Sequence, residues 1–395
     1  MILIAILFLY TAILSFISYQ QICFLKQEKQ KKAEILDEND YKKAANIAIE
    51  NEKFKFFSNL YSFFINTIWL SFGFYFLKNF IIQENSRFEN TLFLLIFLII
   101  TSIANLPVSF YEHFVKDKAH GFSNMTLKIF IQDNIKSILL TIIFGFLIIY
   151  ALLFCYDFFK SLWWIAAFIF SFFVILLINI IYPTLIAPIF NKIQKLEDEN
   201  LQNKISSLMQ KCGFNANGIY VMDASKRDKR LNAYFGGLFK NKRVVLFDTL
   251  LKALNERELL AVLGHELGHF VHKDIIKNLF SSAFMMLLLF FIFAHLPKIL
   301  YTQTHLDNIS AGVFALLLIF GNVFSFIISP LINFLSRKNE FAADLHGAKV
   351  TNKEDMKNAL MALARENKAF IKTSKIYSFF YLSHPNIYDR IKALS

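Results

Sequence analysis

Two histidines and a glutamate in the run His265-Glu266-Leu267-Gly268-His269 have the types and the spacing of a metal site. Residues four apart lie on one face of a helix, so the imidazoles of His265 and His269 can bind one metal ion together. Glu266 lies slightly off that axis and can reach a water molecule that the metal activates. This geometry predicts a zinc peptidase site with one zinc ion per chain.

Zinc held by two histidines needs a third protein ligand and an open position. Glu340 is a candidate ligand, and Asp344 lies one turn later in the same predicted helix. Asp344 would accept the free N–H of a metal-bound imidazole and so fix its orientation. The alternative is that both acids lie at a solvated helix end and pair with Arg337 or Lys338.

Other histidines fit the metal less well. His272 lies one turn after His269, but three ligands on one straight helix cannot surround an ion without strain. We interpret His272 as a bystander or as a group that supports a ligand. His295 and His305 fall on the opposite side of the predicted membrane region and are excluded by topology.

Peptide hydrolysis also needs a proton carrier and a donor for the oxyanion that forms. Glu266 is the predicted general base. His384 and Arg390, in the C-terminal segment, are the candidate oxyanion donors. The alternative is that this histidine and arginine are structural.

Short elements must position these side chains. A helix is predicted over Asn200–Cys212, and strands over Ile219–Met222, Asn232–Phe235 and Arg243–Phe247, with turns at Gly236-Gly237 and at residues 240–242. Asn255 is the expected N-cap of the metal-binding helix, with Glu258 in the capping-box position.

A free strand edge beside the metal-binding helix can hold a substrate as an added strand. Asn232, Ala233 and Tyr234 are the candidate substrate-binding residues on such an edge. The alternative is an ordinary small sheet that only covers the helix.

The rest of the chain is typical of a membrane protein, with 56% hydrophobic residues and 48 Phe. Seven apolar stretches have spanning length: about Ile2–Ser18, Phe57–Ile82, Thr91–Tyr111, Ile138–Tyr156, Leu162–Ile186, Leu279–Leu300 and Ile309–Phe334. The first has no basic start and no small-residue cleavage site, so we expect a retained anchor rather than a signal peptide.

Basic residues orient these spans. Segments 19–56, 112–137, 187–278 and 335–395 contain 38 of the 42 Lys and Arg. The positive-inside rule places those segments in the cytoplasm and the N-terminus outside, so both halves of the predicted site share one side. Residues 24–55 are expected to form a solvated helical hairpin arm without chemistry.

Composition also narrows the function. The three cysteines are far apart, which argues against a disulfide framework or a cysteine metal site. The net charge of +12 fits cytoplasmic loops, and no basic patch interleaved with aromatics indicates a nucleic-acid partner. A non-enzymatic scaffold or transporter would need charged residues within the spans, which hold almost none.

The motifs, taken in order, resemble the type I CAAX prenyl endopeptidases, a family of multi-pass membrane zinc metalloproteases. Beyond the metal-binding motif, the similar segments are Leu106-Pro107, Tyr111, Phe114-Val115, His120-Gly121-Phe122, Tyr182-Pro183, Ile186, Pro188 to Lys192, Asp223 to Phe235, Lys240 to Leu250, Ser336-Arg337, Glu340-Phe341, Ala343-Asp344, Ser383-His384-Pro385 and Arg390. One departure is the run from Ser225 to Leu231, which is more basic than is usual in the family.

This resemblance implies seven helices that enclose a water-filled chamber, closed at its cytoplasmic end by the catalytic domain. It implies zinc bound by His265, His269 and Glu340, with Glu266 as base. It also implies that His384 and Arg390 face the active site and that Asn232 and Ala233 line the substrate strand. The surplus of Phe, Ile, Lys and Asn is typical of an AT-rich genome, so we expect a bacterial member in an inner membrane; a eukaryotic one would lie in the endoplasmic reticulum.

The predicted protein is therefore mainly α-helical, with a small β-sheet in its cytoplasmic zinc-metalloprotease domain. Its predicted parts are residues 1–186 (five spans), 187–278 (catalytic segment), 279–334 (two spans) and 335–395 (C-terminal segment completing the site). The expected substrate is a peptide or protein C-terminus, lipidated in the family's named reaction. The alternative is a quality-control protease that cuts misfolded membrane proteins.

Overall fold

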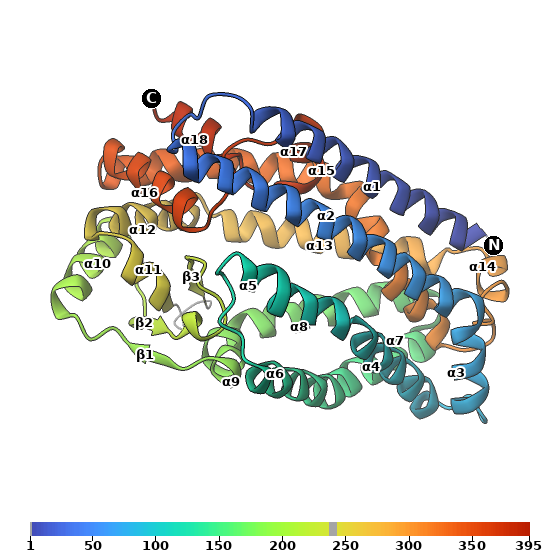
Figure 1. The fold of residues 1–395 in the computed structure, drawn as a ribbon. Coiled ribbons are helices and arrows are strands. Elements are labelled where there is room, and N and C mark those ends of the chain that lie inside the picture. Colours follow the sequence, from blue (N-terminus) through green and yellow to red (C-terminus); the bar gives the residue numbers. More distant parts are fainter. Residues whose placement is uncertain (1, 237–242) are drawn as a thin grey trace.

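The computed structural model describes residues 2–236 and 243–395, and most of them are helical (Figure 1). The longer apolar part consists of α1 (Ile2–Glu28), α2 (Glu38–Ile68), α3 (Phe74–Ile81), α4 (Arg87–Tyr111), α5 (Asp117–Ala119), α6 (Leu127–Leu140), α7 (Phe146–Phe159), α8 (Trp163–Ile181), α9 (Ala187–Phe190), α13 (Asp274–Ala294), α14 (Lys298–Thr302) and α15 (Ala311–Val350). Short π-helical turns η1 (Trp69–Gly73), η2 (Glu112–Lys116), η3 (Thr141–Gly145) and η5 (Tyr182–Ile186) join consecutive helices, and η4 (Lys160–Leu162) is a 3-10 turn.

The remaining elements lie mostly at one end of the molecule, opposite α3, α14 and the N-terminus, with α17 alongside α15 nearer the middle (Figure 1). They are α10 (Glu199–Lys211), α11 (Asp248–Ala253), α12 (Glu256–Val271), α16 (Lys353–Glu366), α17 (Lys375–Tyr381), α18 (Ile387–Ala393), the 3-10 turn η6 (Ala224–Lys226), and strands β1 (Ile193–Lys195), β2 (Ile219–Met222), β3 (Ala233–Gly236) and β4 (Arg243–Phe247).

Six helical stretches in the described part are long and apolar enough to cross a membrane. Five of the seven expected spans each fall in a stretch of their own. The other two, Ile138–Tyr156 and Leu162–Ile186, fall together in the stretch Leu127–Phe190. Within it, Lys160 has a positive φ of 47° between α7 and α8, which pack against each other. The multi-pass helical architecture is thus confirmed.

The arm predicted for residues 24–55 does form a helical hairpin from the end of α1 and the start of α2. It is not simply solvated, however. Tyr41 is fully buried against Ala364 and Ile371 of the C-terminal segment. Glu28 is buried as well and lies 3.6 Å from Lys372. These buried contacts therefore attach the hairpin to the C-terminal segment.

The sheet has the strand order β1-β2-β4-β3, in which β2 and β4 are parallel and the outer pairs are antiparallel. β2 and β4 have the predicted bounds, and β3 begins one residue later than expected. Of the predicted turns, Gly236 ends β3, whereas residues 237–242 lie outside the described part. β1 was not predicted, since three residues carry too little alternation to indicate a strand.

The metal-binding helix α12 begins as predicted. The Asn255 side chain accepts the backbone N–H of Glu258 at 3.0 Å, and the Glu258 carboxylate accepts the backbone N–H of Asn255 at 3.0 Å. This capping box satisfies two backbone donors that a helix start leaves open. Its apolar face enters a core shared by the sheet, α10 and α16.

Small residues bring α12 and α15 into close contact. A Cβ on Gly268 would lie 2.9 Å from the Cα of Ala343, and one on Gly347 would lie 2.9 Å from the backbone N of His265. Neither distance leaves room for a side-chain carbon. Because the backbones approach so closely, short side chains of α15 can reach the histidines of α12.

Candidate metal centre

Three predicted ligands meet where α12 and α15 cross. Glu340 Oε1 lies 3.3 Å from His269 Nε2, and Glu340 Oε2 lies 3.5 Å from His265 Nε2. One ligand atom from each of the three residues lies within 4.8 Å of the other two. The structure thus places all three predicted ligands around one point, although they come from segments 71 residues apart in the chain.

The Nδ1 atoms of both histidines already form hydrogen bonds with carboxylates. Nδ1 of His265 donates to Asp344 Oδ1 at 2.8 Å, and Nδ1 of His269 donates to Asp274 Oδ2 at 3.0 Å, because a carboxylate can only accept. Each Nε2 is therefore the nitrogen that faces Glu340 and can bind a metal.

Glu340 supports the same assignment. It is buried, and its Oε2 has no hydrogen-bond partner in the described part of the chain; the nearest cationic group, Arg390 Nη2, lies 3.7 Å away and is held by Asp344. A buried carboxylate oxygen without a donor is unfavourable unless a cation completes its surroundings. The residues present therefore fit a metal ion.

The alternative for the two acids of α15, a solvated helix end, is wrong. Glu340 and Asp344 are only 3% and 1% exposed. Arg337 does not pair with either acid. Its Nη1 donates to the carbonyl oxygens of Ser378 and Leu382, at 2.8 and 2.6 Å.

Asp274 is a site residue that the sequence analysis missed. It follows Lys273, whose φ of 58° turns the chain back toward α12 after the helix ends. Asp274 is buried, and Lys277 donates to its second oxygen at 2.8 Å. The one signal in the sequence was an acid five residues after His269, and that spacing is not helical.

Glu266 lies beside the ligand cluster without being one of its members. Among the described residues it has neither a hydrogen bond nor an ion pair through its carboxylate. Burial raises the pKa of this carboxyl, although the neighbouring histidines act in the opposite direction. A free carboxylate with a raised pKa suits a group that must take up and release a proton.

His384 and Arg390 both reach the centre. His384 Nε2 lies 3.1 Å from Glu340 Oε1, and the side chain is 63% exposed. Arg390 is mostly buried and donates through Nε and Nη2 to both oxygens of Asp344, at 2.8 and 2.6 Å. The two residues therefore differ in exposure: His384 is largely exposed and contacts Glu340, whereas Arg390 is mostly buried and holds Asp344. Their roles as oxyanion donors stay predictions.

The turn that carries His384 is fixed by a polar stripe on α15 that lies about one to three turns before Glu340. Asn333 Nδ2 and Ser329 Oγ donate to the carbonyl of Phe380, at 2.8 and 3.0 Å. Together with Arg337, these side chains cap the end of α17. The helix that supplies Glu340 thus also positions His384.

The predicted substrate residues lie on an edge strand. β3 pairs with β4 on one side, with Ala233 opposite Leu246, and has no strand on its other side in the described part. It packs beside α12. Burial raises the pKa of Tyr234 to about 12 and so keeps its hydroxyl protonated. The free edge is available for an added strand; whether substrate uses it stays a prediction.

The other histidines lie outside the cluster. The His272 ring is 5.9 Å from the ring of His346 and contacts none of the ligands. His295 packs against Trp164, and His305 against Tyr75, near the opposite end of the molecule.

The site combines two imidazoles from one helix, a carboxylate from a second helix and a free glutamate beside them. In a multi-pass helical protein, this combination defines a membrane metallopeptidase. Residues 195–395 match the model of peptidase family M48, and residues 21–192 match the CAAX prenyl protease N-terminal model with five membrane helices.

Relatives extend over nearly the whole chain. It is 30% identical to CAAX prenyl protease 1 of Saccharomyces cerevisiae, over 96% of this chain and 91% of that protein. It is 30% identical to the CAAX prenyl protease 1 homolog of Homo sapiens, over 91% of this chain and 87% of that protein. The crystal structure of S. mikatae Ste24p matches with a TM-score of 0.89 and 27% identity, covering 99% of this chain and 97% of that one. The chain belongs to peptidase family M48, and the predicted resemblance is confirmed.

Proposed function

We propose that the protein is a zinc-dependent endopeptidase that removes the C-terminal tripeptide of lipidated proteins. The observation that carries the proposal is the cluster of His265, His269 and Glu340, in which each Nε2 atom faces one oxygen of the buried Glu340 carboxylate. The similarity to CAAX prenyl proteases over nearly the whole chain supports the choice of substrate.

Zinc is the proposed metal, with one ion per chain. Two imidazoles and one carboxylate, with a further position open, form the donor set of catalytic zinc sites. His265, His269 and Glu340 would hold the ion. When bound, it would polarise the scissile carbonyl and make a neighbouring water more acidic.

The protein's own groups supply the remaining steps. The carboxylate of Glu266 takes the proton of the attacking water and returns it to the leaving amine. His384, exposed beside the centre, donates from Nε2 to the oxyanion that develops on the carbonyl. Asp344 and Asp274 hold the two imidazoles in orientation.

The substrate main chain is held as an added strand along β3, at Asn232, Ala233 and Tyr234. Because this mode of capture uses backbone hydrogen bonds, it places few demands on side chains. The charge distribution of the loops supports a cytoplasmic site and C-terminus, with the N-terminus outside.

Matched farnesylated and bare C-terminal peptides, given to the purified protein in detergent, test this function. We expect the farnesylated peptide to be cleaved three residues from its end, and the bare peptide far more slowly. Equal cleavage of both would instead favour a general membrane-associated peptidase.

Variants test the chemistry. Glu266→Gln should retain metal and fold but lose cleavage by about 10²-fold to 10⁴-fold. Glu340→Ala should lose stoichiometric zinc. Glu256→Gln is the matched control, because Glu256 is an exposed acid of the same helix that pairs with Lys204 at the surface. Normal turnover by Glu266→Gln would refute the general-base assignment.

A further inference from the structure

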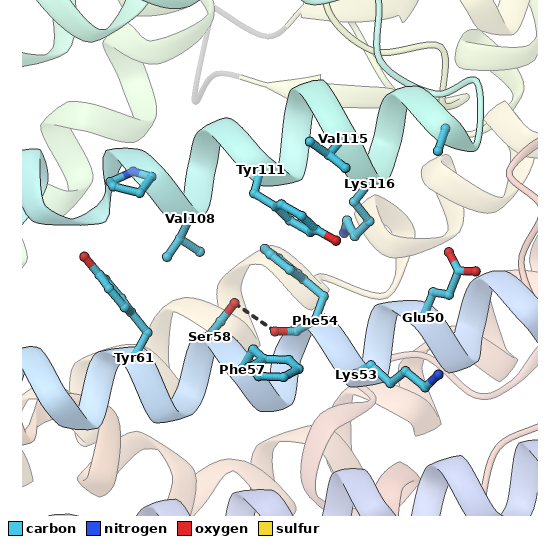
Figure 2. A pocket seen from close by; sticks show the side chains of 12 residues that line it. Glu50, Lys53, Phe54, Phe57, Ser58, Tyr61, Val108, Tyr111, Val115 and Lys116 are labelled. Carbon is cyan, nitrogen blue, oxygen red and sulfur yellow. Dashed lines mark hydrogen bonds between the residues drawn. The ribbon is translucent and has the colours of Figure 1, made fainter.

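A cavity of about 670 Å³ opens between α2 and α4 with η2, away from the metal centre (Figure 2). We refer to it as the α2–α4 groove. Its lining residues are Glu50, Lys53, Phe54, Phe57, Ser58, Tyr61, Pro107, Val108, Tyr111, Val115, Lys116 and Ala119. The volume is within the usual range of sites that bind small molecules.

The walls of the groove are apolar and aromatic. Figure 2 shows the side chains of Phe54 and Phe57 on α2 opposite Val108 and Tyr111 on α4. Phe57 and Tyr111 are 69% and 50% exposed, so the protein itself leaves them largely uncovered. Uncovered aromatic side chains on two facing helices favour an apolar occupant.

Two of the three hydroxyl groups that line the groove are satisfied within the protein. Ser58 Oγ donates to the carbonyl of Phe54 at 2.9 Å, and Tyr61 OH donates to the carbonyl of Ala104 at 2.5 Å. The hydroxyl of Tyr111 forms no hydrogen bond with any described residue, so the largely apolar walls offer an occupant one polar group.

The charged groups of the groove lie at its mouth. Glu50 lies 2.7 Å from His120, and Lys116 lies 3.0 Å from Glu112. Lys53 is a lining cation that forms no ion pair with any described residue, and Lys368 donates to the carbonyl of His120 nearby. The aromatic and aliphatic walls between α2 and α4 therefore fit an apolar chain, and any charged head of an occupant would lie outside them at the mouth.

The mouth of the α2–α4 groove is connected by a hydrogen bond and an ion pair to the segment that leads into β3. Lys229 donates its backbone N–H to the carbonyl of Phe122 at 2.9 Å, and Arg230 pairs with the buried Asp117 at 3.0 Å. Asn232, where the predicted substrate edge begins, follows two residues later. An occupant of the groove thus has its polar end on the side that faces the edge strand.

We propose that the α2–α4 groove binds the isoprenoid chain of the lipidated substrate, while the peptide continues toward β3 and the metal centre. This inference rests on the proposed CAAX-type function and assigns the lipid of that substrate a site of its own. The ligand class is an uncharged polyisoprenyl thioether.

Filling the groove from either wall tests the proposal. Val108→Trp on α4 and Ser58→Phe on α2 should each raise KM for a farnesylated peptide on the order of tenfold, since excluding two or three methylenes from an apolar site loses about that much affinity. Cleavage of the bare peptide should stay within about twofold. Ile100→Trp is the matched control, because Ile100 is an exposed residue of α4 outside the groove.

A second measurement does not depend on activity. A farnesyl peptide with a diazirine at the far end of its lipid is photo-crosslinked to full-length Glu266→Gln protein. We expect adducts within residues 54–61 and 108–115. Adducts elsewhere would overturn the proposal. Loss of the adducts when phospholipid is added would also overturn it, because the groove would then be a site for membrane lipid.

The outcomes separate this inference from the proposed function. If the wild type cleaves both peptides equally, or the groove variants weaken both equally, the groove proposal fails and the peptidase remains. If neither peptide is cleaved, the proposed function fails, and adducts outside the groove would then reject the lipid site as well.

Discussion

Arg390 grips Asp344 through two hydrogen bonds of 2.8 and 2.6 Å, while Asp344 accepts Nδ1–H of His265 at 2.8 Å. The C-terminal helix α18 is thereby connected to His265, a proposed ligand of the candidate metal centre. A bidentate arginine fixes the plane of the carboxylate, and the carboxylate fixes the imidazole.

Arg390→Lys should therefore weaken the metal site although the positive charge is kept, because lysine cannot donate two parallel hydrogen bonds. We expect metal affinity to fall by about tenfold to 100-fold, with Arg390→Ala at least as severe. Metal content after dialysis against a chelator measures this, with Lys392→Ala, an exposed position of the same helix, as control. Full metal affinity together with a loss confined to kcat would show that Arg390 acts on the substrate instead.

Asp274→Asn should also reduce metal affinity, again by about tenfold to 100-fold. The amide cannot balance the charge of His269 as the carboxylate does. Competition with a zinc indicator measures the change. Lys277→Gln, which removes an exposed partner of Asp274, should have a far smaller effect. Equal losses in both variants would contradict a direct role for the carboxylate.

Metal uptake should depend on pH through His269. Burial disfavours its charged form, but hydrogen bonds to Glu340 and Asp274 outweigh this and raise the pKa of His269 to about 9. In the metal-free protein the imidazole is thus protonated at neutral pH, and metal must displace that proton. Apparent zinc affinity should rise with pH and level off above about 9. Titration calorimetry in buffers of different ionisation enthalpy counts the released proton; a pH-independent affinity would contradict this.

Arg337→Ala should loosen the turn that carries His384, since two carbonyls at the end of α17 lose their donor. We expect kcat to fall by about tenfold or more while metal content is unchanged. Arg337→Lys should recover part of the loss, and Lys338→Ala on the exposed side of α15 should have little effect. A variant with normal kcat, or one that loses metal, would contradict the positioning role.

Features that depend on residues close together in the chain could mostly be predicted from the sequence. The short apolar runs of β2 and β4, the capping box of Asn255 and the four-residue spacing of His265 and His269 each depend on neighbours in the chain. Glu340 could be proposed as a ligand because it follows the last apolar run and continues its helical pattern.

Features that depend on distant segments could not be predicted in this way. Asp274 needs a left-handed residue to reach His269, and the close approach of Gly268 to Ala343 needs two helices to meet. The α2–α4 groove arises from helices whose sequences each resemble an ordinary span. The arm appeared solvated in sequence because its burial depends on Ile371 and Ala364, more than 300 residues away.

α15 runs from Ala311 to Val350 and contains Pro330, and both the end of the expected span at Phe334 and the proposed ligand Glu340 lie on this one helix after the proline. At 1.5 Å per residue, Glu340 lies only about 9 Å along the helix axis beyond the apolar run. The distance of the proposed site from the apolar run is therefore set by the short helical segment between Phe334 and Glu340. Peptide bonds close to a membrane anchor are within reach of such a site, and bonds farther along a substrate come to it only if the chain bends back toward the apolar run.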